Sequence, residues 1–302
     1  MMRKLVLLMV LLAAGGGLAF WFVTAPKTLS ASEAAILPAG NAQAGERVFH
    51  AAGCSSCHAR PDAVGEAKLE LAGGHRFATG FGTFVAPNIS PDPQAGIGAW
   101  TPVQFANALL HGVSPSGAHF YPAFPYTSYA RMTQQDVADL FAYMQTLPPV
   151  AQRAPENEVS FPFNIRRALG GWKWLYMRAG PVAALPADAS DLVRRGQYLV
   201  EGPGHCGECH TPRNALGGPD YARWLKGGPA AEGEGKVPDI TPSGIGSWSQ
   251  KDIAYYLESG FTPDFDSVGG TMVAVQENMA KLPASDREAI AAYLKALPGA
   301  GE

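Results

Sequence analysis

The longest apolar run of the chain lies at its start. Within residues 1–30, the segment Leu5–Val23 carries no charge, follows Arg3 and Lys4, and ends in Phe20-Trp21-Phe22. A helix of this length spans the hydrocarbon core of a bilayer, and aromatic residues favour its boundary with water. A secretory signal peptide has a shorter apolar run that precedes a small-residue cleavage site. We therefore expect an uncleaved membrane anchor rather than a removed signal peptide, and both alternatives place the rest of the chain outside the cytoplasm.

Farther along, apolar residues recur at helical spacing in two segments. The positions that share one face are Val137, Leu140, Phe141 and Met144 in the first segment and Ile290, Tyr293, Leu294 and Leu297 in the second. This spacing predicts two amphipathic helices. Thr133 with Asp136, and Ser285 with Glu288, are predicted to cap their first turns. We call these two segments the terminal helices.

Each half of the chain also begins with a short helical segment that contains a glycine. Gly45 lies in the first of these segments and Gly196 in the second. A glycine has no Cβ, so it lets two helices cross closely. We expect these helices to cross the terminal helices near Tyr143 and Tyr293.

A tryptophan before a helix start also occurs twice. Residues 88–100 begin with Asn-Ile-Ser-Pro and end with Gly-Ile-Gly-Ala-Trp, and residues 239–248 begin with Asp-Ile-Thr-Pro and end with Gly-Ile-Gly-Ser-Trp. Thr101-Pro102 and Ser249 with Asp252 then supply helix caps. Such self-similarity predicts one small α-helical unit that is present twice.

The repeat predicts how the chain is divided. The expected segments are the anchor at 1–30, a first domain at 38–148, an inter-domain strap at 149–189 and a second domain at 190–300. Prolines recur in the strap and stiffen it. Trp172 and Trp174 indicate that the strap packs against the domains. One short helix is expected within residues 164–178.

Composition and charge narrow the class of protein. Apolar residues make up 47% and charged residues 16% of the chain, which excludes a disordered polyelectrolyte. The 35 glycines and 25 prolines favour compact units with many loops. A net charge of −3 offers no basic face for nucleic acid, so we expect no nucleic-acid partner.

All four cysteines belong to two copies of one motif. The copies are Cys54, Cys57 and His58, and Cys206, Cys209 and His210. C-x-x-C-H is the attachment signature of haem c, in which two thiols hold one porphyrin and the adjacent histidine is the proximal iron ligand. A zinc ribbon needs cysteine pairs about 15–20 residues apart. A thioredoxin-like pair has no use for the histidine, and a disulfide across two residues closes a poor loop. We therefore predict two covalently bound haem c groups.

Further segments carry a resemblance to a known family. These segments are Phe81–Phe84, Ala86–Ile89, Tyr121–Tyr126, Phe161–Arg166 and Gly204–Asn214. With the two motifs, the chain resembles the membrane-associated multihaem cytochrome c subunits of bacterial periplasmic alcohol, gluconate and aldehyde dehydrogenases. Many members of that family have three haems, whereas this chain has two motifs. The resemblance implies an all-α fold with two tandem class I cytochrome c domains after the anchor.

The resemblance also bears on the sixth iron ligand. A class I fold supplies a methionine from the loop before the terminal helix, where Met132 lies in the first domain. In the second domain both Met272 and Met279 lie in the corresponding loop, and Gly270-Thr271-Met272 is similar to the Gly-x-Met pattern of the family. We expect Met132 and Met272 to be the distal ligands, with Met279 as the alternative. The rival ligands for the first iron are His111 and His119.

These expectations describe an electron-transfer protein rather than an enzyme. By resemblance, a dehydrogenase subunit is the electron donor and ubiquinone or a terminal oxidase is the acceptor. The globular domains are expected in the periplasm, attached to the bacterial cytoplasmic membrane. One alternative is a dihaem peroxidase or thiosulfate dehydrogenase, which the available methionines disfavour because such an enzyme needs an open iron position or an unusual ligand. Another is the dihaem subunit of a haem-copper oxidase, which Ala86–Ile89 and Phe161–Arg166 disfavour.

Overall fold

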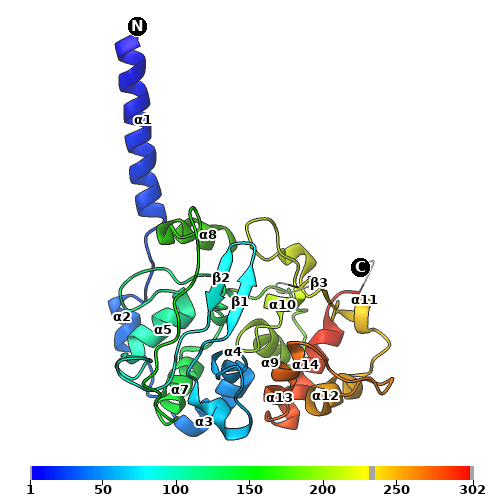
Figure 1. Cartoon of the computed structure of the whole chain (residues 1–302). Coiled ribbons are helices and arrows are strands. Elements are labelled where there is room, and N and C mark those ends of the chain that lie inside the picture. Colours follow the sequence, from blue (N-terminus) through cyan, green and yellow to red (C-terminus); the bar gives the residue numbers. More distant parts are fainter. Residues whose placement is uncertain (1, 231–234, 300–302) are drawn as a thin grey trace.

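Helices dominate the fold, and one of them stands apart from the rest. The computed structural model describes residues 2–230 and 235–299 of the 302. In Figure 1, α1 (Met2–Val23) projects from a body in which the remaining elements pack together. Within the described residues the strands form two small antiparallel pairs, β1–β2 and β3–β4.

The remaining elements follow in chain order. The other α-helices are α2 (Ala31–Ala35), α3 (Ala42–Ala51), α4 (Cys54–His58), α5 (Pro102–His111), α6 (Tyr126–Tyr129), α7 (Gln134–Met144), α8 (Leu169–Tyr176), α9 (Asp191–Glu201), α10 (Gly207–His210), α11 (Pro242–Ile245), α12 (Gln250–Ser259), α13 (Met272–Met279) and α14 (Ala284–Ala296). Short 3-10 helices occur at Gly65–Glu70, Arg166–Ala168 and Tyr221–Arg223. The strands are β1 (Arg76–Thr79), β2 (Gly82–Val85), β3 (Gly228–Pro229) and β4 (Lys236–Val237).

The helix α1 has the properties of a membrane span. It has 22 residues, a mean hydropathy of 2.4 in its most apolar window and no buried residue, and among the described residues it alone has the length and composition to cross a bilayer. At 1.5 Å per residue it is about 33 Å long, close to the roughly 30 Å of a hydrocarbon core. The apolar run predicted at Leu5–Val23 therefore lies on one continuous helix.

Three of the predicted helix caps are confirmed. The side chains of Thr101, Thr133 and Ser249 each accept a hydrogen bond from the backbone N–H three residues later, at the starts of α5, α7 and α12. These bonds satisfy backbone donors that have no partner inside the helix. The caps depend on residues within one turn of each other, which is why the sequence pattern was sufficient to find them.

The predicted cap at Ser285 is wrong. The helix α14 begins one residue earlier, at Ala284, and Pro283 occupies the capping position without a side-chain bond. The fixed φ of proline suits a helix start. Asp286, in the first turn, is engaged by Arg47 from α3 in a bond of 2.6 Å. Contacts from a distant helix thus take part in fixing how this helix begins.

The predicted helix crossings are confirmed at both glycines. A Cβ placed on Gly45 would lie 1.9 Å from a carbonyl oxygen of α7, and one placed on Gly196 would lie 1.8 Å from a carbonyl oxygen of α14. The Cβ atoms of Tyr143 and Tyr293 are the nearest side-chain atoms at these crossings. The pairs α3–α7 and α9–α14 therefore pack backbone to backbone, and glycine is required at both points.

Two apolar clusters form the core. Prominent buried members are Phe49, Phe105, Val137 and Leu140 in the first cluster and Leu199, Ile253, Ile290 and Tyr293 in the second. The apolar stripes predicted for the terminal helices point into these clusters. Burial of such side chains is the main favourable contribution to folding.

The strap between the halves contains a short helix, as predicted. It also forms a strand contact that the sequence pattern did not predict. Within residues 164–178 lie a 3-10 turn and α8. Glu158 forms an isolated antiparallel bridge with Thr83 of β2. The sequence analysis gave no indication of β1 and β2, because four-residue strands carry too little alternation to be recognised. The strap therefore packs along a hairpin of the first half.

Candidate haem sites

Both C-x-x-C-H motifs fold as a single helical turn. The first is α4, Cys54–His58, and the second is α10, Gly207–His210, with Cys206 at its capping position. Residues three apart lie on the same side of a helical turn. The two thiols of each motif can therefore reach the same planar ring, with the histidine one residue farther on.

The two histidines are held in the same way. Nδ1 of His58 lies 2.8 Å from the carbonyl oxygen of Pro87, and Nδ1 of His210 lies 2.9 Å from that of Pro238. Because a carbonyl oxygen only accepts, Nδ1 carries the proton and Nε2 keeps its lone pair. Burial lowers the pKa of both imidazoles and favours their neutral form. A neutral imidazole fixed through Nδ1 is the form that ligates a metal through Nε2.

A glycine supports each histidine loop. The N–H groups of Gly73 and Gly227 donate to the carbonyl oxygens of His58 and His210, at 2.7 Å in both cases. Their φ angles are 72° and 69°, and a Cβ would lie 2.4 or 2.5 Å from a backbone oxygen. Only glycine fits there. The same loop geometry therefore brings the proline carbonyl to the imidazole in both halves.

The thiols are poor candidates for thiol–disulfide exchange. Burial raises the pKa of the Cys54 and Cys206 thiols to about 12. Reactive cysteine pairs have a lowered pKa, because the thiolate is the nucleophile. Two thiols on one side of a turn, a neutral oriented imidazole and a glycine-supported loop fit a covalently attached haem c.

In the first half, the predicted distal ligand lies near the attachment turn. Met132 is 6% exposed and belongs to the first apolar cluster, against which Cys54 also packs. Its N–H donates to the carbonyl of Tyr129 at 2.9 Å, in the turn between α6 and α7. The structure therefore brings Met132 and the first motif to the same cluster.

In the second half, Met279 belongs to the corresponding cluster and Met272 packs against it. Met272 is the first residue of α13 and is half-buried, whereas Met279 is the last and is 3% exposed. Cys206 packs against the same cluster. Seven residues of helix separate the two sulfur-bearing positions by about 10 Å along the axis. An iron has one distal position, so only one of the two methionines can be its ligand.

The two halves do not present methionine at the same position. Ala130 directly follows α6 and Ala280 directly follows α13, and the turns at these alanines have the same hydrogen bonds. Two residues after these alanines the first half has Met132 and the second has Leu282. The repeat that relates the attachment turns therefore does not extend to the distal side.

Each attachment turn also lies against the other half. Asn278 of α13 donates through Nδ2 to the hydroxyl of Ser56 at 3.0 Å. In the reverse sense, the hydroxyl of Ser128 in α6 donates to the carboxylate of Glu208 at 2.8 Å. The sequence pattern gave no indication of these contacts, since a single polar residue in a short helix gives no signal of burial. Each attachment turn is thus held by a side chain of the other half, at an interface between the halves.

The histidines beside the motifs belong to this interface. Nδ1 of His50 lies 3.2 Å from Oδ1 of Asn278, and Nε2 of His205 lies 3.2 Å from the carbonyl oxygen of Ala52. The ring of His205 also lies 5.6 Å from that of Tyr129, edge to face. Both histidines link one half of the chain to the other.

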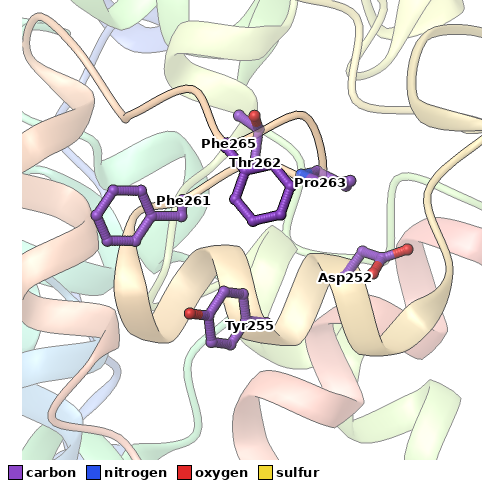
Figure 2. A pocket seen from close by; sticks show the side chains of 6 residues that line it. All are labelled: Asp252, Tyr255, Phe261, Thr262, Pro263 and Phe265. Carbon is purple, nitrogen blue, oxygen red and sulfur yellow. The ribbon is translucent and has the colours of Figure 1, made fainter.

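A surface hollow on the second half lies outside these sites. Its lining includes Tyr255 of α12 and Phe261 and Phe265 of the following loop, as Figure 2 shows. None of the predicted ligand residues lines it. Phe265 is 92% exposed.

Comparison with known proteins agrees with this geometry. The family profile described as cytochrome c matches residues 42–148. A protein named diheme cytochrome c-type from Cereibacter sphaeroides is 58% identical over 259 residues, which cover 86% of each chain.

Two similar proteins are named as subunits of dehydrogenases. The fructose dehydrogenase cytochrome subunit of Gluconobacter japonicus is 40% identical over 83% of this chain and 51% of its own length. The cytochrome c subunit of alcohol dehydrogenase (quinone) from Gluconacetobacter polyoxogenes is 37% identical over 85% of this chain and 56% of its own length. The chain thus spans about half the length of these two relatives.

Proposed function

The chain belongs to the family of c-type cytochromes that includes cytochrome c subunits of bacterial dehydrogenases, and from this premise we propose that it transfers electrons from a partner dehydrogenase to the respiratory chain. Relatives of this kind are electron-transfer subunits, not catalytic ones, and this chain is an electron-transfer subunit. It carries haem c, and the name of the C. sphaeroides relative supports a count of two.

One observation carries the proposal: the attachment geometry occurs twice. The residues proposed to hold the two groups are Cys54, Cys57 and His58, and Cys206, Cys209 and His210. In both copies Nδ1 of the histidine lies within hydrogen-bonding distance of a proline carbonyl, which leaves Nε2 available. When bound, haem c supplies reversible one-electron chemistry. The chain supplies the ligands, an apolar surrounding and the fixed relation between the two sites.

The proposed distal ligands remain Met132, in the turn before the terminal helix α7, and Met272, at the start of α13, the helix that precedes the terminal helix α14. A thioether raises the reduction potential of a haem iron and closes its sixth position. That arrangement suits a carrier and disfavours the peroxidase alternative. In the second half Met279 is the competing ligand, since it is the more deeply buried of the two.

The membrane and the partners belong to the same proposal. We assign residues 38–148 and 190–300 to two tandem class I cytochrome c domains, held in the periplasm by α1 in the cytoplasmic membrane. The length and composition of α1 support the anchor. The acceptor is ubiquinone or a terminal oxidase. The donor is a dehydrogenase subunit that binds this chain.

The test is a count of covalent haem in protein purified from membranes. We expect two haems per chain in a pyridine haemochrome assay, with haem stain retained after denaturing electrophoresis. Replacing Cys54 and Cys57 with serine leaves one haem, and so does the matched replacement of Cys206 and Cys209. Haem that acid acetone extracts from the wild type would contradict covalent attachment.

The same preparation tests the anchor and the donor. The intact mass of the membrane-bound protein includes residues 1–30 if the anchor is uncleaved. A dehydrogenase subunit co-purifies, and its substrate reduces the cytochrome spectrum of the complex. A soluble chain that begins near residue 30 and lacks such a partner would overturn this part of the proposal.

A further inference from the structure

The helix α8 buries its charged side chain and exposes apolar ones. Lys173 is 8% exposed, and its Nζ donates to the last two carbonyl groups at the end of α5, at 2.6 and 2.7 Å. The same Nζ lies 4.6 Å from the ring centre of Tyr126. Trp174 and Leu175, the next two residues, are 72% and 52% exposed. Because the lysine is held at one end of α5, the rotation of α8 is set and these apolar side chains face outward.

Apolar residues earlier in the strap are exposed as well. Phe161, Phe163 and Ile165 are also exposed, and with Trp174 and Leu175 they form what we call the strap face. Phe161 alone is 77% exposed. Scattered apolar side chains are normal on a protein surface, but a group of this kind within fifteen residues indicates a contact with something apolar.

The part of the strap face that belongs to α8 lies where α1 leaves the globular body. In Figure 1, α8 lies at the base of α1. The helix α8 contacts the residue that follows α1, because a Cβ placed on Gly170 of α8 would lie 2.3 Å from the carbonyl oxygen of Thr24. Nε of Arg167 donates to the hydroxyl of Thr24 at 3.0 Å, and its guanidinium lies 4.1 Å from the ring centre of Trp21. The contacts at this junction fix the position of the strap along the axis of α1, close to the end of that helix.

The charge of the strap favours a lipid surface over a typical protein partner. From residue 159 to residue 187 the chain has four basic residues and no acidic one, although its net charge is −3. The basic residues are Arg166, Arg167, Lys173 and Arg178; Lys173 faces inward, whereas Arg178 is exposed and the two other arginines are half-buried. Basic and aromatic side chains side by side are typical of segments at the boundary between lipid headgroups and hydrocarbon.

We propose that the strap face rests in the headgroup region of the membrane that α1 crosses, so that the protein contacts this membrane at two places. The proposal rests on the proposed insertion of α1. If α1 spans the hydrocarbon core, Thr24 lies at its outer boundary, and α8 beside it lies at headgroup depth. Trp174, Leu175 and the phenylalanines then bury apolar area, and Arg178 faces phosphates. Two membrane contacts hold the globular body in one orientation. A single helix with a flexible connection would leave the body free to reorient.

The depth of single positions in a bilayer tests this inference. Full-length haem-loaded protein is reconstituted into phosphatidylethanolamine–phosphatidylglycerol vesicles after nitroxide labelling of Trp174→Cys or Phe161→Cys. The measurement is the ratio of accessibility to oxygen, which enters lipid, over accessibility to a water-soluble nickel complex. Phe265→Cys is the matched control, because Phe265 is an exposed aromatic whose loop follows α12, far from α1 in Figure 1. Protein without an introduced cysteine is labelled in parallel, which measures any nitroxide that attaches to the native cysteines.

We expect the ratio at positions 161 and 174 to exceed that at position 265 several-fold in vesicles. Equal ratios at all three positions would overturn the inference and leave the strap face to a protein partner. A label at Leu11→Cys in α1 separates this result from failure of the anchor. A lipid-like ratio at position 11 with water-like ratios at 161 and 174 refutes the strap contact alone. A water-like ratio at position 11 refutes the anchor and, with it, this inference.

Discussion

At the scale of single residues, one proline carbonyl in each half orients the histidine of the attachment motif. Each accepts from Nδ1 of an imidazole, His58 or His210, and so decides which nitrogen is left for a metal. The distal side is not built with the same regularity. Met132 occupies the position of Leu282, and the second half offers Met272 and Met279 at the two ends of one helix.

The first residue-scale prediction concerns these methionines. Met132→Ala and Met272→Ala are each expected to remove about half of the weak red charge-transfer band of the oxidised protein, because that band reports sulfur bonded to iron. Each change lowers the potential of one haem and opens a site for carbon monoxide. Met279→Ala leaves the band intact. Loss of the band in Met279→Ala instead of Met272→Ala would reassign the ligand, and carbon monoxide binding by the reduced wild type would contradict six-coordinate irons.

At the scale of elements, the backbone crossings at Gly45 and Gly196 hold each half together. The helices that precede the attachment turns, α3 and α9, lie directly on the terminal helices there. The positions of the motifs therefore depend on two residues without side chains. The caps at Thr101, Thr133 and Ser249 act locally, since each ties a helix start to its own first turn.

The element-scale prediction is that Gly196→Ala destabilises the protein. Its Cβ would lie 1.8 Å from a backbone oxygen, so the helices must separate. Overpacking of this kind costs about 1–3 kcal/mol or more of unfolding free energy. Urea unfolding followed by circular dichroism measures it. The matched control is Gly180→Ala, where a Cβ meets no atom within 4 Å, and a shared unfolding midpoint for the two variants would contradict the crossing.

At the scale of the whole molecule, the two halves are joined by polar contacts around their terminal helices. Asp286 of α14 is 1% exposed and pairs with Arg47 of α3 at 2.6 Å and with Arg195 of α9 at 3.0 Å. In the opposite direction, the hydroxyl of Tyr198 donates to the carboxylate of Asp136 in α7. Each half therefore sends a side chain to the start of the other half's terminal helix.

The whole-molecule prediction is a pH dependence that originates in Asp286. Burial alone would raise its pKa, but the hydrogen bonds and charges of Arg47 and Arg195 outweigh burial and hold the pKa below its ordinary value of 3.8. A group whose folded pKa is lowered stabilises the fold above its unfolded pKa and loses this effect as the pH falls through the folded pKa. Asp286→Asn is expected to lower the free energy of unfolding by about 2 kcal/mol at pH 7. This value allows for the partial exposure of both arginines, which weakens the ion pairs.

The measurement is urea unfolding of wild type and Asp286→Asn from pH 7 down to pH 3. We expect the difference in unfolding free energy to be constant near neutral pH and to shrink below about pH 4. Asp188→Asn is the control, because Asp188 is exposed. A difference between wild type and Asp286→Asn that does not change with pH would rule out the ionised carboxylate as its source.

The sequence by itself determined the features that depend on residues close together in the chain. The C-x-x-C-H motifs, the three confirmed caps and the apolar stripes involve residues within a few positions of one another. The repeat also gave the crossings at Gly45 and Gly196, because a glycine in a helix that recurs in both halves indicates a close approach. The resemblance of further segments also indicated the family of the protein, which the comparisons confirm.

Only the tertiary structure decided which distant groups meet. Asn278 binds Ser56 across 222 positions, and Arg47 binds Asp286 across 239. A sequence pattern carries no information on such pairs, because they follow from how the two halves pack. The same holds for α8: the sequence pattern predicted that Trp174 packs against the domains, but the structure leaves this side chain 72% exposed. Lys173 faces inward because the end of α5 supplies its carbonyl acceptors, and this tertiary contact outweighs the tendency of a charged side chain to face water.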